Sequence, residues 1–207
     1  MRDPDASEPV MRLSAPSELA LDADFPPLSM ALLDVLLRRR SCREFDPRAL
    51  RLAVLSRLLW AAFGINRPAE SGRTAPSAQN QQEMRVYVAL ASGLYLYDAH
   101  AHLLRLVVAD DLRAATGGQD FAAAAPVNLI YVAELDPVPG ASRVEQEFYA
   151  ALDTGHISQN VYLFCAAEGL GAVARGHVDR PALARLMRLA PGQQVILAQS
   201  VGYPRPA

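Results

Sequence analysis

The chain contains no lysine, and all 20 of its lysine-or-arginine positions are arginine. This absence excludes every mechanism that needs a lysine amine, including Schiff-base chemistry, a lysine general base and the lysine of a phosphate-binding P-loop. A bias of the coding sequence toward arginine is the plain explanation, but the chemical consequence holds whatever its cause.

Several other signatures are missing. There are only two cysteines, Cys42 and Cys165, and neither lies in a CxxC or Cys/His spacing typical of zinc sites. We expect both to be small buried residues in a reducing compartment. A GxGxxG motif is absent, which argues against a Rossmann domain, and a GxSxG motif is absent, which argues against a serine hydrolase.

Long apolar runs are also missing, since none reaches the roughly 18 residues that a membrane-spanning helix needs. The net charge of −2 provides no field to attract nucleic acid. Residues 1–16 lack the apolar stretch of a signal peptide, so we expect a cytoplasmic protein. The chain is nevertheless 51% hydrophobic, with a mean hydropathy of +0.08. An oligomer interface is the simplest place for the surplus apolar surface.

Hydrophobic periodicity predicts an α+β domain, in which a mixed β-sheet packs on a long central helix and flanking helices. Residues 1–27 carry five prolines and are expected to form an extended arm, and residues 28–207 the domain. The helix at 144–168 is apolar on most faces, so we expect it to be buried all round, His156 included. The other expected helices are 31–40, capped by Ser29, 52–63, and one from Asp179 to Leu189. The expected strands are 85–90, 94–97, 127–133, 172–175 and 194–201.

Three segments carry residues suited to ligand binding. Arg38-Arg39-Arg40-Ser41-Cys42-Arg43 crowds four guanidinium groups and a hydroxyl at a helix end, a set that binds phosphate well. The alternative is a solvated basic helix end that is stabilised by the helix dipole.

The second segment is residues 74–82 (TAPSAQNQQ), within a long polar loop at 66–82. Long loops in compact domains are usually functional, and this one offers amide and hydroxyl groups to a planar heterocycle. An ordinary polar turn is the alternative. In the third segment, residues 166–173, Gly169 and Gly171 allow close backbone approach to a ligand, and Gly169 also suits a helix C-cap.

Four segments, in this order, resemble motifs of the nitroreductase family. They are residues 39–45 (RRSCREF), 74–82, 151–173 and 196–204, and the resemblance extends over the chain from about residue 28 to residue 204. The resemblance is greatest to short nitroreductases and to flavin-dependent thiazoline and oxazoline dehydrogenases. It implies a homodimer with FMN at the interface, and NAD(P)H as co-substrate.

The resemblance also implies roles for individual residues. Arg39, Arg40, Ser41 and Arg43 would hold the phosphate and ribityl end of FMN, with Arg205 as a further phosphate ligand. The loop residues Pro76, Ser77, Asn80 and Gln82 would contact the flavin, with Ser77 and Asn80 coming from the other subunit. Leu170 and Gly171 would place backbone N–H groups near the reactive N5 edge. No catalytic side chain, metal, membrane or nucleic-acid partner is expected, because the flavin carries the hydride chemistry.

The implied function is transfer of hydride from NAD(P)H through FMN to a nitroaromatic, quinone or similar acceptor. One alternative is an azoline-type dehydrogenase that oxidises a heterocycle in a modified peptide. Better-known members of that group use a lysine–tyrosine pair, which this chain lacks. Another alternative is a flavin-binding or storage protein without turnover.

Overall fold

The computed structural model describes residues 15–23, 30–135 and 142–205. These residues form one seven-stranded sheet in the order β1-β6-β5-β4-β7-β9-β8, whose neighbouring strands all pair antiparallel. The strands are β1 (Glu18–Ala20), β4 (Met84–Leu90), β5 (Gly93–Asp98), β6 (Leu103–Val108), β7 (Val127–Glu134), β8 (Gly171–Arg175) and β9 (Gln193–Gly202). A parallel component comes from a single bridge between Ser41 and Ala172.

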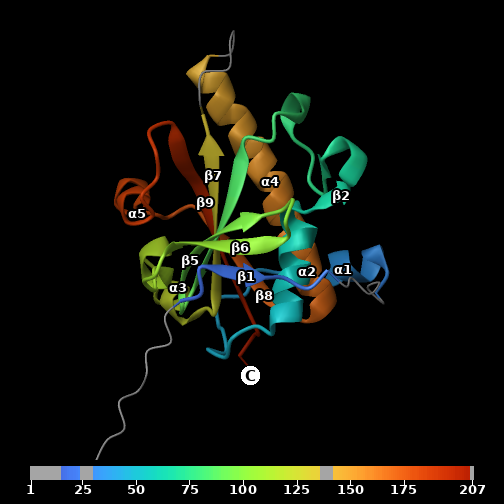
Figure 1. The fold of residues 1–207 in the computed structure, drawn as a ribbon. Coiled ribbons are helices and arrows are strands. Elements are labelled where there is room, and N and C mark those ends of the chain that lie inside the picture. The colour runs from blue at the N-terminus through green and yellow to red at the C-terminus, as the bar shows by residue number, and fades with distance from the viewer. Residues whose placement is uncertain (1–14, 24–29, 136–141, 206–207) are drawn as a thin grey trace, which may run out of the picture.

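Helices cover the sheet on both faces (Figure 1). The helices are α1 (Leu32–Arg38), α2 (Leu52–Phe63), α3 (Asp120–Ala124), α4 (Arg143–Glu168) and α5 (Arg180–Leu186). α4 lies along one face with α2 beside it, and α5 packs against β9 on the other face. The α+β class with a long central helix is therefore confirmed.

The main core lies between α2, α4 and the sheet. Leu58 and Leu59 of α2 are fully buried against α4 residues such as Ile157 and Val161. Complete burial of each such side chain stabilises the fold by about 1.5–3 kcal/mol. β7 is buried along nearly its whole length between β4 and β9, which confirms the prediction of a central strand at 127–133.

Most predicted elements are found within one to three residues of their expected ends. α2 has the predicted bounds and ends at Gly64, and Asp179 caps α5 by accepting a hydrogen bond from the Ala182 N–H. Ser29 lies outside the described residues, and the N-cap position of α1 is occupied by Ala31. None of the described helices is long and apolar enough to span a membrane.

Three expectations were wrong in detail. α4 is not buried all round, because Val144, Phe148 and Leu152 are between 45% and 75% exposed. The His156 side chain is 51% exposed, on the solvent side of this helix, rather than buried in the core. Part of the arm forms β1, the sheet's edge strand beside β6, and β6 itself was not foreseen.

The loop at 66–82 is also more ordered than expected. It contains the short strands β2 (Ile65–Arg67) and β3 (Gly72–Arg73), which pair with each other. Two 3₁₀ turns, Pro68–Glu70 and Ala78–Asn80, complete it. A two-stranded hairpin and two single turns leave no periodic hydrophobic signal in the sequence, which is why this structure was missed.

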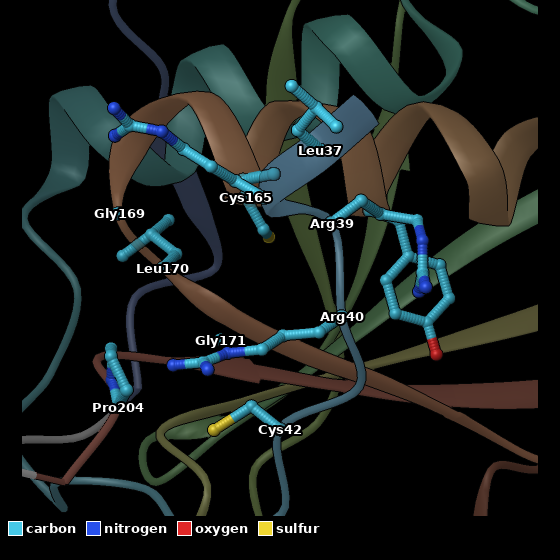
Figure 2. Close-up of a pocket in the computed structure, with 12 residues that line it drawn as sticks. Leu37, Arg39, Arg40, Cys42, Cys165, Gly169, Leu170, Gly171 and Pro204 are labelled. Atoms are coloured by element: carbon cyan, nitrogen blue, oxygen red, sulfur yellow. The ribbon is translucent and has the colours of Figure 1, made fainter. Parts of the chain in front are cut away.

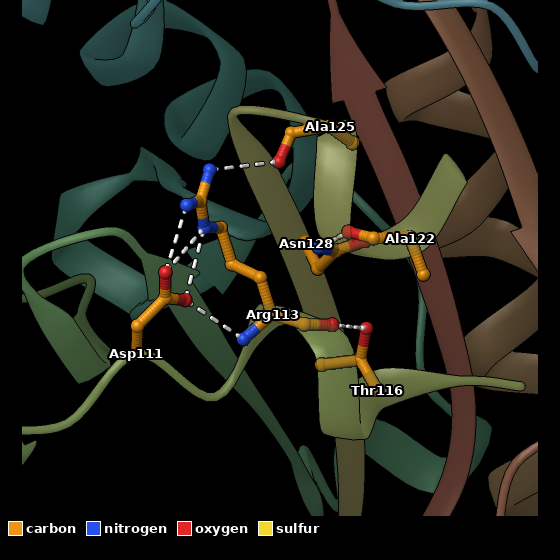
Figure 3. A network of polar contacts seen from close by, with 6 residues as sticks. All are labelled: Asp111, Arg113, Thr116, Ala122, Ala125 and Asn128. Atoms are coloured by element: carbon orange, nitrogen blue, oxygen red, sulfur yellow. Dashed lines mark hydrogen bonds and ion pairs between the residues drawn. The ribbon is translucent and has the colours of Figure 1, made fainter. Parts of the chain in front are cut away.

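A polar network holds the chain that crosses between β6 and β7 (Figure 3). The Arg113 guanidinium binds the Asp111 carboxylate through two nitrogens and also donates to the Ala125 carbonyl. The Thr116 hydroxyl donates to the Arg113 carbonyl at 2.7 Å, and the Asn128 amide donates to the Ala122 carbonyl at 2.8 Å.

The same network surrounds the buried guanidinium of Arg175, which is only 3% exposed. Arg175 donates to the Thr116 carbonyl and hydroxyl, the Asn128 side-chain oxygen and the Ser200 hydroxyl, at 2.7–3.1 Å. Burial lowers the pKa of Arg175 to about 10. Neutral oxygen acceptors therefore fix the position of this charged side chain on β8.

We expect Gly117→Ala to lower the free energy of unfolding by about 1–3 kcal/mol. A Cβ at Gly117 would overlap the Nη1 atom of Arg175, which cannot move away without losing its buried hydrogen bonds. Chemical denaturation measures the change. Gly118→Ala is the matched control, since its Cβ would have ordinary 3.5 Å contacts with His177. Equal stability of the two variants would contradict this account.

Candidate functional site

A cavity of about 380 Å³ lies where α1, the C-terminal end of α4 and the start of β8 meet (Figure 2). Figure 2 shows Arg40 reaching across it toward Gly171 and Pro204. The lining residues are Leu37, Arg38, Arg39, Arg40, Cys42, Tyr162, Cys165, Ala166, Gly169, Leu170, Gly171 and Pro204. The structure thus brings the first and third predicted segments into one pocket.

The arginine segment (residues 38–43) reaches the pocket because the chain leaves the helical conformation at Arg39. Arg39 has φ −56° and ψ 119°, so α1 ends at Arg38, two residues earlier than predicted. The following residues run beside the edge strand β8, where the Cys42 N–H donates to the Ala172 carbonyl at 2.9 Å. Farther along, Phe45 bridges to Pro204, and the Arg205 N–H donates to the Glu44 carbonyl.

The turn after α4 forms another side of the pocket. Gly169 caps the helix with φ 68°, a left-handed conformation that favours glycine. A Cβ at Gly171 would lie 2.8 Å from the Cys42 sulfur, so only glycine lets the arginine segment pack this closely on β8. Cys165 is buried as expected, but Cys42 is half-buried in extended chain.

The backbone of this turn is already partly engaged. The Leu170 N–H donates to the Cys165 carbonyl at 2.8 Å, and Gly171 pairs with Gly202 of β9. The expectation that these two N–H groups face a flavin edge therefore stays a prediction. The Leu170 side chain is largely buried and contributes an apolar surface to the pocket.

The electrostatic character of the pocket is positive. Three arginines line it, and none of the lining residues that the structure describes is acidic. The guanidinium of Arg39 is half-buried over the ring of Tyr162, with 5.4 Å between its central carbon and the ring centroid. Arg43 and Arg205 are exposed and adjoin the pocket in sequence, but neither lines it. Such a set suits an anionic group such as a phosphate.

The loop residues form their own structure. Ser77 Oγ accepts a hydrogen bond from the Gln82 N–H at 2.7 Å, and the Gln82 amide donates to the Asn80 side-chain oxygen at 2.9 Å. Arg73 donates to the Gln82 side-chain oxygen. Asn80 and Gln82 both have positive φ, which explains why the loop needs these internal bonds. Pro76 is exposed at its start.

Within one chain, this loop lies away from the pocket. The Ala78 N–H donates to Asp153 Oδ2 at 3.1 Å, which ties the loop to α4. Asp153 precedes Tyr162 by about two and a half turns of helix, or roughly 13 Å along the axis. The structure therefore does not bring Ser77, Asn80 and Gln82 together with the arginines in a single subunit.

The prediction from sequence missed Tyr162, whose side chain lines the pocket. In the sequence it is one of many large residues in a long apolar helix, and no spacing marks it. Leu37 also lines the pocket, and its chemistry gives no signal either.

Glu83 and Asp153 form a pair of acidic side chains beneath the loop. Both carboxylate oxygens of Glu83 are buried without a hydrogen-bond partner among the described residues. Burial raises the pKa of Glu83, and the neighbouring Asp153 carboxyl raises it further. A proton on Glu83 would thus be held beside the carboxylate that anchors the loop.

The chain is similar to known proteins in sequence and in fold. Residues 36–203 match the sequence profile of the nitroreductase family. The protein MJ1384 of Methanocaldococcus jannaschii, provisionally named a nitroreductase, is 35% identical over 156 residues, covering 70% of this chain and 78% of its own.

Solved structures agree with that match. One from Ralstonia eutropha JMP134, also provisionally named a nitroreductase, is 41% identical, with a TM-score of 0.88 over 94% of this chain and 92% of its own. The NADPH:FMN oxidoreductase of Vibrio harveyi, solved with NAD⁺, has a TM-score of 0.63 at 19% identity. It covers 84% of this chain and 69% of its own, and shares the fold.

We expect Glu83→Gln to raise the melting temperature at neutral pH. Folding raises the pKa of Glu83 above its ordinary value of 4.5. Glu83 therefore lowers the stability of the folded state progressively as the pH rises from 4.5 through the raised pKa. The gain should therefore vanish below pH 4.5 and reach a plateau above the raised pKa. Thermal unfolding across this range measures it.

Glu145→Gln is the control with the opposite sign. Hydrogen bonds from Ser142 lower the pKa of Glu145, so its charge stabilises the folded state at neutral pH. A Glu83→Gln variant that is less stable than the parent at pH 7, or equally changed at every pH, would contradict the assignment.

Proposed function

The chain belongs to the nitroreductase family, and from that premise we propose that it is an FMN-dependent oxidoreductase using NAD(P)H. The acceptor would be a nitroaromatic, a quinone or a similar small molecule. The observation that carries the proposal is the pocket itself, which is lined by three arginines and the turn after α4 and has no acidic side chain among its described lining residues. We place the protein in the cytoplasm on the sequence argument alone.

The residues present fit FMN in size and chemistry. A cavity of about 380 Å³ is within the usual range for cofactor sites. Arg39 and Arg40 would bind the phosphate, with Ser41 and Arg43 beside them and Arg205 close by. Leu170, Cys165 and Ala166 supply an apolar surface suited to a flat ring system. The bound flavin would accept a hydride from the nicotinamide and pass it to the acceptor.

We propose further that a second copy of the chain completes the site. α1 exposes a row of leucines, of which Leu32, Leu33 and Leu37 are between 65% and 77% exposed. On α4, Phe148 is 59% exposed. Apolar surface of this kind on neighbouring helices is typical of an interface. A partner packed here would bring its loop of Pro76, Ser77, Asn80 and Gln82 to the pocket.

The alternatives are weaker. An azoline dehydrogenase of the lysine–tyrosine type is disfavoured because the chain has no lysine. A storage protein needs flavin binding alone, and steady-state NAD(P)H consumption separates it from an enzyme.

The proposal is tested by the visible spectrum of the purified protein, before and after NADH or NADPH is added without oxygen. We expect a flavin spectrum that bleaches with at least one nucleotide and recovers when a nitroaromatic or quinone is added. A bound flavin that neither nucleotide bleaches would refute the oxidoreductase function. A protein that neither contains nor takes up FMN would refute the site.

The variant Arg40→Ala tests whether the flavin is bound in this pocket. Loss of a charge-assisted bond to phosphate should cost about 1.5–3 kcal/mol, or roughly a tenfold to hundredfold loss of FMN affinity. Fluorescence titration with FMN measures the change. Arg185→Ala removes another exposed arginine, from α5 and away from the pocket, and should leave the affinity unchanged. Equal affinities for the two variants would remove Arg40 from the site.

The variant Leu33→Glu tests whether a second copy of the chain is needed for FMN binding. We expect a charge on the exposed face of α1 to convert a dimer into a monomer and to abolish FMN retention, because the partner's loop is lost. Sedimentation and flavin content are the measurements. Leu186→Glu places the same charge at a 47% exposed leucine on α5 and should change neither. A Leu33→Glu monomer that holds FMN as tightly as the parent would show that one chain suffices.

A further inference from the structure

The Tyr162 side chain, which lines the pocket, contacts Ser41, Ala174 and Arg39. It projects from α4, its hydroxyl reaches both β8 and the arginine segment, and its ring lies beneath Arg39. One aromatic side chain therefore connects α4, the arginine segment and the edge strand β8.

The hydroxyl occupies a defined place in the hydrogen-bond pattern of β8. The Cys42 N–H donates to the Ala172 carbonyl. Two residues later in β8, the arginine segment no longer pairs with the strand. At that position the Ala174 N–H donates to the Tyr162 hydroxyl oxygen at 2.8 Å. Tyr162 therefore satisfies a donor of the sheet edge that would otherwise lack a protein partner in this pattern.

The same hydroxyl lies 3.2 Å from Ser41 Oγ. Because its oxygen accepts from Ala174, its hydrogen is available to Ser41. When Tyr162 donates, the Ser41 oxygen acts as the acceptor and the Ser41 hydrogen stays available to an external anion. Ser41 is exposed and stands between Arg40 and Cys42, which both line the pocket.

The ring has a separate contact with Arg39, whose guanidinium carbon lies 5.4 Å from the ring centroid. A cation at this distance is attracted to the face of an aromatic ring. The contact restricts a long side chain at the pocket without neutralising its charge, which a carboxylate partner would do.

We propose that Tyr162 is a positioning residue for the phosphate-bearing end of the flavin, acting through the Ser41 hydroxyl and the Arg39 guanidinium. The proposal rests on the proposed FMN function. Tyr162 takes no part in hydride transfer. It sets the direction of one hydrogen-bond donor and the location of one cation before the cofactor binds, which lowers the entropic cost of binding.

The test compares FMN dissociation constants, measured by fluorescence titration of flavin-free protein, for Tyr162→Phe, Ser41→Ala and the double variant. Tyr162→Phe keeps the ring and removes the hydroxyl, so we expect roughly a tenfold weaker affinity. Because Tyr162 acts through Ser41, the double variant should bind no more weakly than Ser41→Ala alone.

Tyr95→Phe is the matched control. Its hydroxyl lies 3.1 Å from Ser92 Oγ, so the variant also removes a tyrosine–serine contact, but at the hairpin between β4 and β5. We expect its FMN affinity to equal that of the parent. Equal effects of Tyr162→Phe in the parent and in the Ser41→Ala background would overturn the proposal in favour of a purely structural role at β8.

A parent protein that fails to bind FMN would refute the proposed function itself, whereas a parent that binds FMN as tightly as Tyr162→Phe does would refute only the role of Tyr162. O-methyltyrosine at position 162 keeps the proposal testable if Tyr162→Phe does not fold. It retains the ring and an oxygen that can accept from the Ala174 N–H, but it has no hydrogen to donate to Ser41. We expect FMN affinity to fall in the otherwise unchanged protein and not to fall further in Ser41→Ala, and no fall in the former would overturn the proposal.

Discussion

The hydrogen bond from the Cys42 N–H to the Ala172 carbonyl fixes the arginine segment to the edge of the sheet, and the geometry of the site depends on it. The bond is possible because α1 ends at Arg38 and because Gly171 has no side chain to collide with Cys42. It leaves Arg40 and Cys42 facing the pocket. The charges therefore take their positions from backbone pairing, which is more rigid than pairing among long side chains.

The helix α4 connects the two halves of the proposed site. Its C-terminal part carries Tyr162 and Cys165 at the pocket, and Asp153, nearer its N-terminus, anchors the loop through the Ala78 N–H. The separation of about 13 Å between Asp153 and Tyr162 along one helix keeps the loop of a single chain apart from its own arginines. Two copies arranged about a shared interface would satisfy this constraint, and the exposed apolar side chains of α1 and α4 are where such an interface belongs.

The sequence was most informative where one physical pattern dominates. The continuous apolar run at 127–133 predicted a central strand, and β7 is one. Periodicity located α4 but overstated its burial, because an exposed apolar residue such as Phe148 contributes to the pattern in the same way as one facing the core. β6 was missed because the exposed Arg105 interrupts its apolar residues in the middle of the strand.

In the site, too, some residues could be predicted from the sequence and others could not. Arg39, Arg40, Leu170 and Gly171 were predicted together from the family resemblance, and they line one pocket. The role of Tyr162 depends on its hydroxyl contacting Ser41, which is 121 residues away in the sequence, and Ala174, which lies on β8. No spacing rule encodes such a contact. The loop residues were found by motif, but their internal hydrogen bonds became visible only in three dimensions.

A crystal structure of the protein with FMN bound tests the central claim most directly. The account predicts the phosphate at Arg39 and Arg40, the ring system against the turn at Leu170 and Gly171, and the loop at 76–82 of a second chain against the same flavin. A flavin bound elsewhere, or one enclosed by a single chain with its phosphate away from these arginines, would contradict it.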